Sequence, residues 1–277
     1  MNNVTHYLQQ LTVPDPSSHK GQNGKLLLIG GSELFHAASR WSLEVASKCV
    51  DMVFYASVPS NNDLIREAKA NFWNGIVIER EEIEAYLTEA DCVLIGPGMT
   101  RTADTTEITN HLLQTYPHKK WVIDAGALQM ADPHLFNEQM IITPHTEEFV
   151  RVMTHLDPSY QSKTEVTIAD IQVASRQLNN ATLLHKRKID VVANATEGVM
   201  VEGGNAGMTK GGTGDVLAGL VAALYCTHDA MTAAVVGSYI NKKAGDALYK
   251  KVGPYFNATD LVAEIPQTLW SELNSLP

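Results

Sequence analysis

The stretch Gly211-Gly212-Thr213-Gly214-Asp215 leads directly into an apolar run, Val216–Leu224. Glycines lack a Cβ, so the backbone of this turn can come close to a ligand and can adopt positive φ angles. The run that follows is rich in helix-forming residues, which predicts a helix with the turn at its N-terminus. Unpaired amides and the helix dipole at such an end favour an anion such as phosphate. We therefore expect an anion hole at Gly212, Thr213 and Gly214.

Asp215 places a carboxylate beside this expected anion hole. The stretch is not a Walker-type phosphate loop, because no lysine and hydroxyl residue follow its glycines. An aspartate here suits general-base catalysis on a hydroxyl that attacks a phosphoryl group, a contribution of about 10²–10⁴ in rate. We therefore expect Asp215 to be catalytic. The alternative is a glycine-rich loop in which Asp215 only caps the helix.

Upstream of the turn, short apolar runs alternate with helix-like stretches such as Ala37–Val50. The runs predict strands at Lys25–Ile29, Met52–Ala56, Gly75–Ile78, Cys92–Ile95, Trp121–Ile123 and Met140–Ile142. Strands separated by helices indicate βαβ units and a parallel sheet that is covered on both faces. Three closely spaced runs, Thr182–His185, Val191–Asn194 and Val199–Val201, predict hairpin-connected strands at one sheet edge. We expect residues 1–277 to form a single domain, a three-layer α/β/α sandwich with a mostly parallel central sheet.

Composition limits the partners of the chain. It has 277 residues, a formal net charge of −10 and no basic patch, which argues against binding to nucleic acid. No apolar run approaches the roughly 20 residues of a membrane span, and the first residues do not resemble a signal peptide. The cysteines, Cys49, Cys92 and Cys226, are scattered, which fits a reducing cytoplasm. We expect a cytoplasmic protein that binds phosphate through local amides and a few cations.

The wider stretch Gly204–Gly219 closely resembles the signature of the NAD(P)H-hydrate dehydratases, which belong to the ribokinase-like superfamily. Further segments resemble motifs of that family and occur in its order: His19-Lys20-Gly21 with Gly24, Gly30-Gly31-Ser32, Gly96-Pro97-Gly98, Asp124–Leu128, and Thr143-Pro144-His145 with Glu148. Each motif alone is weakly specific, but the collinear set covers most of the chain. The resemblance implies a ribokinase-like fold and a stand-alone dehydratase domain.

The resemblance also implies an activity. Family members restore NADH or NADPH whose nicotinamide ring has been hydrated, with ADP or ATP as phosphoryl donor and Mg²⁺ as cofactor. The ring hydroxyl is phosphorylated, and phosphate, a better leaving group than hydroxide, is then eliminated. By analogy, Asp215 takes the hydroxyl proton and the amides around Gly214 hold the phosphoryl group during transfer. The family resemblance suggests a homo-oligomer, a tetramer, while the sequence identifies no metal ligand.

The family's ligand contacts fall on particular residues of this chain. Those to the hydrated dinucleotide fall on Ala38, Gly98, His145 and Asp215, and those to the donor nucleotide fall on Gly214 and the segment Lys186–Asp190. Several of these residues have a structural alternative. Ala38 could be a plain helix residue, Gly98 could serve only its turn, and His145 could cap a helix that begins near Glu147.

The donor segment departs most from the family pattern. The family favours Lys-Gly followed shortly by Thr, whereas this chain has Lys186-Arg187-Lys188-Ile189-Asp190. Arg187 removes a close backbone approach, and Asp190 puts a carboxylate near the expected phosphates or ribose. The three basic residues could equally supply the local positive charge that an acidic protein needs. In a smaller departure, Gly126 replaces an aspartate of the family.

Three functions therefore remain open on the sequence alone. The first is a nucleotide-dependent dehydratase, and the second is a small-molecule kinase of the same fold, which would use the same glycine turn and aspartate. The third is a catalytically decayed nucleotide-binding protein, suggested by the unusual segment Lys186–Asp190. The blocks His19-Lys20-Gly21 and Thr143-Pro144-His145 favour the dehydratase.

Overall fold

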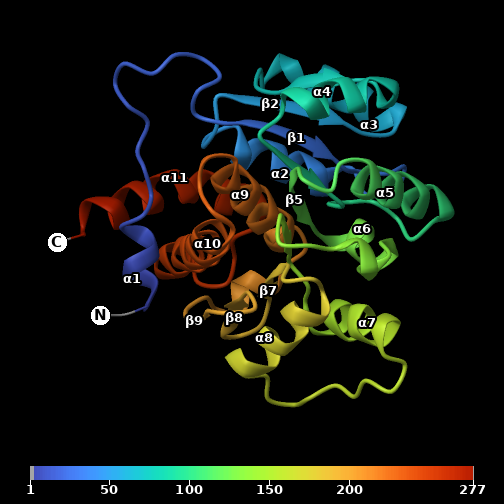
Figure 1. The fold of residues 1–277 in the computed structure, drawn as a ribbon. Coiled ribbons are helices and arrows are strands. Elements are labelled where there is room, and N and C mark those ends of the chain that lie inside the picture. The colour runs from blue at the N-terminus through green and yellow to red at the C-terminus, as the bar shows by residue number, and fades with distance from the viewer. Residues whose placement is uncertain (1–2, 277) are drawn as a thin grey trace.

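A computed structural model describes residues 3–276 and shows a twisted central sheet between two layers of helices (Figure 1). The sheet has nine strands in the order β3-β2-β1-β4-β5-β6-β7-β8-β9. Strands β1 to β7 run parallel, and β8 and β9 are antiparallel to their neighbours. The strands are β1 Lys25–Ile29, β2 Met52–Ala56, β3 Ile76–Ile78, β4 Cys92–Ile95, β5 Lys120–Ile123, β6 Met140–Ile142, β7 Thr182–His185, β8 Asp190–Ala193 and β9 Gly198–Val201.

Helices connect the strands and cover both faces of the sheet. The α-helices are α1 Asn3–Leu8, α2 Ala37–Ala46, α3 Pro59–Glu67, α4 Ile83–Glu89, α5 Ala103–Thr115, α6 Ala125–Met130, α7 Thr146–Leu156, α8 Ile168–Gln177, α9 Thr213–Thr227, α10 Ala230–Val252 and α11 Ala258–Asn274. Short 3₁₀ turns lie at Ala68–Ala70, Arg80–Glu82, Pro133–Leu135 and Ala206–Thr209.

The alternation of side chains along each strand produces two separate cores. In β1, Leu26 and Leu28 pack with α2, α9, α10 and α11 on one face, while Leu27 and Ile29 pack with α4 to α8 on the other. Full burial of each such side chain contributes roughly 1.5–3 kcal/mol. The arrangement confirms the predicted three-layer α/β/α sandwich with a mostly parallel sheet.

The strand predictions agree with the structure to within one residue at either end. The predicted hairpin strands are also confirmed, because β7, β8 and β9 pair in antiparallel fashion at one sheet edge. Helix α2 ends at Ala46 rather than at Val50, since the chain then closes in tighter turns such as Lys48 N–H to Val45 C=O. Helix α11, which carries Pro266 inside it, was not expected from the sequence. Among residues 3–276 no helix combines the length and apolar character that spanning a membrane requires.

The parallel strands bring the functional motifs to one edge of the sheet. The segments after β1, β4, β5, β6 and β7 all leave the carboxyl end of a strand, and parallel strands end on the same side. Hydrogen bonds tie these segments together: Gly31 N–H donates to Pro97 C=O at 2.7 Å, and Lys186 N–H donates to Pro144 C=O at 2.8 Å. Open α/β sheets usually bind their ligands at this edge.

Candidate functional site

The glycine turn forms the N-terminus of α9, as the sequence predicts. Gly212 is the residue before the helix and has a φ of 97°, and a Cβ at this position would lie 2.4 Å from Cζ3 of Trp41. Only glycine fits there. The Thr213 hydroxyl donates to the carbonyls of Met208 at 2.7 Å and Lys210 at 3.0 Å, which closes the turn. The Lys210 ammonium bonds the carbonyls of Pro254 and Phe256, a structural role.

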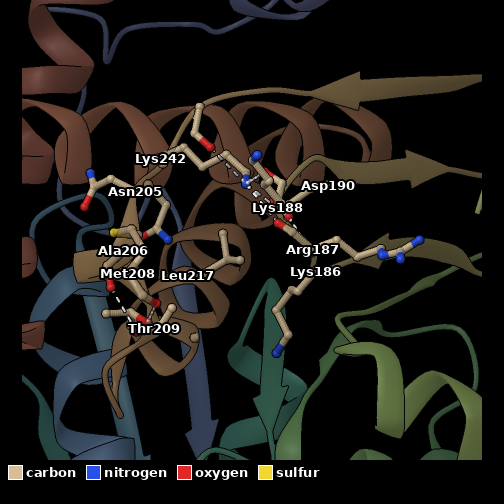
Figure 2. Close-up of a pocket in the computed structure, with 15 residues that line it drawn as sticks. Lys186, Arg187, Lys188, Asp190, Asn205, Ala206, Met208, Thr209, Leu217 and Lys242 are labelled. Carbon is tan, nitrogen blue, oxygen red and sulfur yellow. Dashed lines mark hydrogen bonds and ion pairs between the residues drawn. The ribbon is translucent and has the colours of Figure 1, made fainter. Parts of the chain in front are cut away.

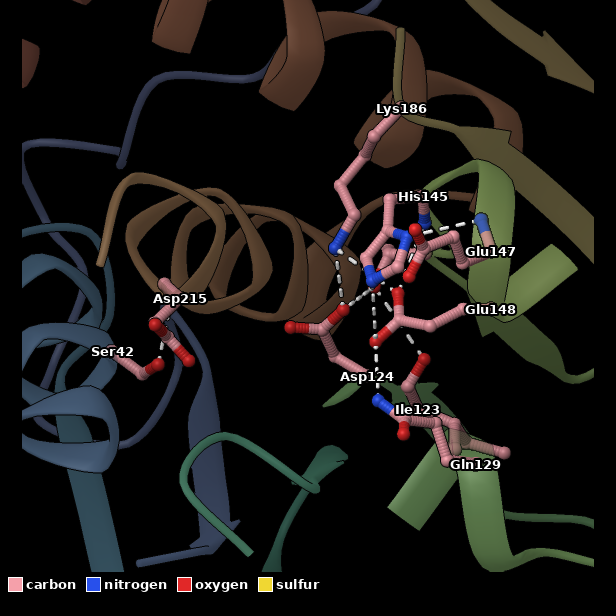
Figure 3. Close-up of polar contacts among 10 residues, drawn as sticks. Ser42, Ile123, Asp124, Gln129, His145, Glu147, Glu148, Lys186 and Asp215 are labelled. Carbon is pink, nitrogen blue, oxygen red and sulfur yellow. Dashed lines mark hydrogen bonds and ion pairs between the residues drawn. The ribbon is translucent and has the colours of Figure 1, made fainter. Parts of the chain in front are cut away.

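Asp215 lies in the first turn of α9, beside α2. Its backbone carbonyl accepts a hydrogen bond from the Ser42 hydroxyl at 2.7 Å (Figure 3). Burial, and then the negative charge of Asp124, raises the pKa of the Asp215 carboxyl to about 7, while Lys186 opposes this change. A carboxyl whose pKa lies near neutral pH can accept a proton efficiently. The environment of Asp215 therefore suits a general base.

A second cluster of charged side chains lies across the site from Asp215 (Figure 3). The Lys186 ammonium lies 2.8 Å from Oδ1 of Asp124 and 4.0 Å from Oε2 of Glu148. The Thr143 hydroxyl also donates to Oδ1 of Asp124, at 2.7 Å. Burial alone lowers the pKa of Lys186, but the two carboxylates outweigh it, so that this pKa lies above its usual value. Lys186 therefore stays charged at the site.

His145 caps the N-terminus of α7, the structural role that the sequence offers as the alternative to ligand binding. Its Nδ1 accepts from the backbone N–H of Glu147 at 3.1 Å, and the backbone N–H of His145 donates to Oε2 of Glu148 at 3.0 Å. The imidazole is 47% exposed, and its Nε2 lies 3.4 Å from Oε1 of Glu148. Capping thus fixes a half-exposed imidazole next to the Asp124–Lys186 pair, where its exposed surface can contact a ligand.

Ala38 and Gly98, both predicted substrate contacts, lie against each other. A Cβ on Gly98 would lie 3.1 Å from the Cβ of Ala38 and 2.9 Å from the carbonyl oxygen of Phe35, and the φ of Gly98 is 75°. Gly98 is therefore required by its turn, whether or not it also binds ligand. The Gly126 departure has a packing cause, because a Cβ there would lie 2.1 Å from the Met99 carbonyl.

A cavity of about 470 Å³ adjoins the start of α9 (Figure 2). Its lining includes Gly214, Lys186 and two residues of α10, Asn241 and Lys242, together with the apolar side chains of Met208 and Leu217. The volume lies within the range of small-molecule sites, roughly 300–1,000 Å³. The lining includes Gly214 but not Asp215, the next residue along α9.

The predicted donor segment contributes four residues to this cavity, Lys186, Arg187, Lys188 and Asp190, whereas Ile189 is 37% exposed and outside the lining. The Arg187 guanidinium bonds the Thr164 carbonyl at 2.9 Å. The Asp190 carboxylate does not stand as a free charge in the cavity. It accepts from Arg187 N–H at 2.8 Å and from the Ser238 hydroxyl at 2.7 Å, and it pairs with Lys242 at 3.2 Å.

A family model described as NAD(P)H-hydrate dehydratase matches residues 26–267, which include all of these site residues. The chain belongs to the NAD(P)H-hydrate dehydratase family. Its similarity to the bifunctional NAD(P)H-hydrate repair enzyme of Methanocaldococcus jannaschii is 36% identity over 95% of this chain and 51% of the relative. The chain therefore spans about half the length of that relative. An ADP-dependent (S)-NAD(P)H-hydrate dehydratase of Nitrosopumilus maritimus is 29% identical over 90% of this chain and 89% of its own length.

Solved structures place this family member in the ribokinase-like fold. A ribokinase-like superfamily protein of Enterococcus faecalis superposes with a TM-score of 0.80 at 25% identity, over 97% of this chain and 94% of the other. An ADP/ATP-dependent NAD(P)H-hydrate dehydratase of Bacillus subtilis, co-crystallised with ATP and Mg²⁺, superposes with a TM-score of 0.75 at 20% identity, over 98% and 97%. The fold expected from the sequence is thus confirmed.

In this dehydratase-family chain, two residues of the site, Asp124 and Glu148, were not expected from the sequence as partners of Lys186. Both occur in the quoted family motifs, yet neither was assigned a role. Asp124 follows β5 directly and Glu148 lies in the first turn of α7, after β6. Carboxylates that follow parallel strands were the available signal, because the ends of such strands converge.

Proposed function

We propose that this chain catalyses the nucleotide-dependent dehydration of hydrated NADH or NADPH. The observation that carries the proposal is that Gly214 and Asp215, which are consecutive residues, belong to two different parts of the site. Gly214 lines the cavity that suits a nucleotide, while the next residue, Asp215, carries a carboxyl of raised pKa beside α2, where Ala38 and Gly98 meet. Consecutive residues at a helix N-terminus would then touch the phosphoryl donor and its acceptor.

In the proposed reaction, the Asp215 carboxylate removes the proton of the ring hydroxyl as that oxygen attacks the terminal phosphorus of the donor. A P–O bond forms to the ring oxygen, and the P–O bond to the departing nucleotide breaks. The C–O bond of the phosphorylated ring then breaks, phosphate leaves with the bonding electrons, and a ring proton is lost as the dihydronicotinamide reforms. Water is thereby removed at the expense of one phosphoanhydride bond.

Electrostatic stabilisation of the transferring group would come from two sources. The amides at the start of α9, around Gly212, Thr213 and Gly214, lie at the positive end of the helix dipole. Thr213 N–H makes only a long 3.4 Å contact to the Lys210 carbonyl, which leaves it available to a phosphate oxygen. Lys186, which lines the same cavity, supplies a fixed positive charge next to Gly214.

The residues at the site fit Mg²⁺ that arrives with the nucleotide. Among the described residues no group of three or more His, Cys, Asp or Glu side chains is arranged to hold a metal. Mg²⁺ commonly needs only one or two carboxylates together with substrate phosphates. Asp124 makes both of its side-chain hydrogen bonds through Oδ1, so its Oδ2 is the candidate ligand. When bound, the ion would neutralise charge on the phosphates.

The relatives support ADP or ATP as the donor. The Nitrosopumilus protein is named as ADP-dependent, and the Bacillus protein, which is named as dependent on ADP or ATP, was crystallised with ATP and Mg²⁺. We also propose that the chain acts in the cytoplasm as a homo-oligomer, a tetramer by family resemblance. Light scattering on the purified protein tests the assembly, and a monomer at micromolar concentration would contradict it.

A spectrophotometric assay tests the proposed activity directly. Hydrated NADH or NADPH is mixed with enzyme and Mg²⁺ and with ADP or ATP in separate cuvettes, and the absorbance of the reduced nicotinamide is followed. Recovery of that absorbance together with release of phosphate is the expected result. A stable phosphorylated product without recovery would instead identify a kinase. Nucleotide binding without turnover would identify a non-catalytic member of the family.

A further inference from the structure

One face of α10 carries three polar residues at intervals of four, Ser238, Lys242 and Asp246. Residues spaced by four share one face of a helix. Lys242 lines the cavity next to α9, and Ser238 and Asp246 bond residues that line it, Asp190 of β8 and Gly204. We call Ser238, Lys242 and Asp246 together with Asp190 the α10 clasp. The two residues Asp190 and Lys242 are buried, at 4% and 7% exposure.

Lys242 is the centre of the α10 clasp. Its ammonium lies 3.2 Å from the Arg187 carbonyl, 3.1 Å from the Lys188 carbonyl and 3.4 Å from the Gly203 carbonyl. It also pairs with Oδ1 of Asp190 at 3.2 Å (Figure 2). One side chain therefore joins two backbone segments that line the same cavity and come from different connections, β7 to β8 and β9 to α9.

The other members of the clasp secure the same two segments. The Ser238 hydroxyl donates to Oδ2 of Asp190 at 2.7 Å, and Oδ1 of Asp190 accepts from Arg187 N–H at 2.8 Å. Asp246 accepts from Gly204 N–H at 3.1 Å and from the amide of Asn205 at 3.0 Å. The segment 186–190 and the segment 203–205 are thus each held at several points by one helix face.

We propose that the α10 clasp is a positioning device that sets the shape of the donor cavity, with Lys242 as its key positioning residue. The inference rests on the proposed function, because it takes a nucleoside diphosphate or triphosphate as the ligand of this cavity. Arg187 occupies the position at which the family has a glycine, so the backbone cannot approach the ligand closely there. Lys242 instead draws the carbonyls of Arg187 and Lys188 toward α10, so that their positions are fixed before the nucleotide arrives.

Stability alone does not explain why the ion pair between Asp190 and Lys242 is buried. Apolar residues of similar volume often stabilise a fold as well as a buried pair does, or better. The pair is better explained by its hydrogen bonds, because an apolar side chain at position 242 could not hold the carbonyls of Arg187, Lys188 and Gly203. The clasp also accounts for Asp190, one of the two residues of the donor segment that depart from the family pattern.

The test separates positioning from stability by removing both charges at once. The double variant Asp190→Asn with Lys242→Met leaves no unpaired buried charge and is expected to fold with a melting temperature close to that of the wild type. Its affinity for ADP and ATP, measured by calorimetry, is expected to fall about ten- to a hundredfold. The KM for the hydrated dinucleotide is expected to stay unchanged. Lys250→Met, an exposed lysine on the same helix, is the matched control and should bind nucleotide normally.

If the folded double variant binds ADP and ATP as the wild type does, the inference is overturned. If KM values for donor and hydrate rise together, the clasp is only a structural element and the inference again fails. Wild type that binds nucleotide, depends on Lys242 for doing so, and yet restores no NADH would contradict the proposed function while supporting the clasp. Wild type that binds neither ADP nor ATP would overturn both.

Discussion

At the scale of single residues, the Asp215 carboxyl is expected to reduce the stability of the fold and to support catalysis. Its folded pKa of about 7 lies well above the value of an exposed aspartate, so its ionisation at pH 8 reduces stability, because the unfolded chain ionises more easily. Asp215→Asn is therefore expected to raise the melting temperature at pH 8. The same change should lower turnover at least about a hundredfold, because the proposed general base is lost.

The measurement pairs the repair assay with a thermal melt of the same Asp215→Asn preparation. A gain in stability combined with a loss of activity is typical of a residue kept for function. Turnover near the wild-type value would remove the base assignment. A lower melting temperature would contradict the burial argument for the raised pKa.

The pH profile should respond to the neighbours of Asp215. Turnover is expected to fall as the pH drops below about 7, because protonated Asp215 cannot accept a proton. Asp124→Asn removes a charge that raises this pKa, so the acid limb of kcat/KM should move to lower pH. Lys186→Met removes a charge that lowers it, so the limb should move to higher pH. Shifts in the same direction would contradict the electrostatic description. Asp104→Asn, at an exposed ion pair with Arg80, should leave the profile unchanged.

At the scale of elements, the N-terminus of α9 depends on two glycines for different reasons. Gly212 has a positive φ and faces Trp41, so Gly212→Ala should lower the free energy of unfolding by at least about 1 kcal/mol. A Cβ on Gly214 would meet only the Lys186 ammonium, at 3.7 Å. Gly214→Ala should therefore keep its stability but weaken ADP binding about tenfold, because the added methyl group keeps phosphate away from the amides.

Chemical unfolding and calorimetric titration of both variants check this contrast. Gly211 is the matched control, because a Cβ there meets nothing within 4 Å. Gly211→Ala should change neither stability nor affinity. Normal ADP binding by Gly214→Ala would show that phosphate does not approach this end of α9.

At the scale of the whole molecule, acid stability should depend on His185 of β7. This imidazole is fully buried and stacks on Phe149 with ring centroids 4.7 Å apart, and neither ring nitrogen has a hydrogen-bond partner within residues 3–276. Burial, and then the charge of Arg187, lowers its pKa from 6.5 to about 4. Its contribution to stability is therefore complete above about pH 6.5 and is lost as the pH falls toward 4, a loss of about 3 kcal/mol.

Urea unfolding between pH 4 and pH 7.5 measures this loss. The stability of His185→Leu relative to the wild type should rise as the pH falls through this range, because the variant lacks the buried imidazole, while His118→Leu, at an exposed position, should follow the wild type. Equal acid sensitivity of wild type and His185→Leu would contradict the prediction. The same experiment tests whether residues 1–277 form one domain, since a single cooperative transition is expected.

The sequence by itself determined the strands, the layers and the glycine turn. A continuous apolar run such as Leu26–Ile29 depends only on neighbouring residues, so it predicts a buried strand without knowledge of the strands that pair with it. The helix that follows Asp215 and the positive φ of Gly212 are local properties as well. The edge of the sheet at which the candidate site lies follows from the order of strands and helices.

Only the tertiary structure decided which charges meet. Lys186 pairs with Asp124, which is 62 residues away along the chain, and Asp190 pairs with Lys242 on α10. From the sequence alone, Asp190 puts an unfavourable negative charge near the expected phosphates or ribose. In the structure, its pairing with Lys242 neutralises that charge. The physical reason is that helix and strand propensity depends on adjacent residues. The pKa of Asp215 and the partner of a buried carboxylate depend instead on side chains that only folding brings within a few ångströms.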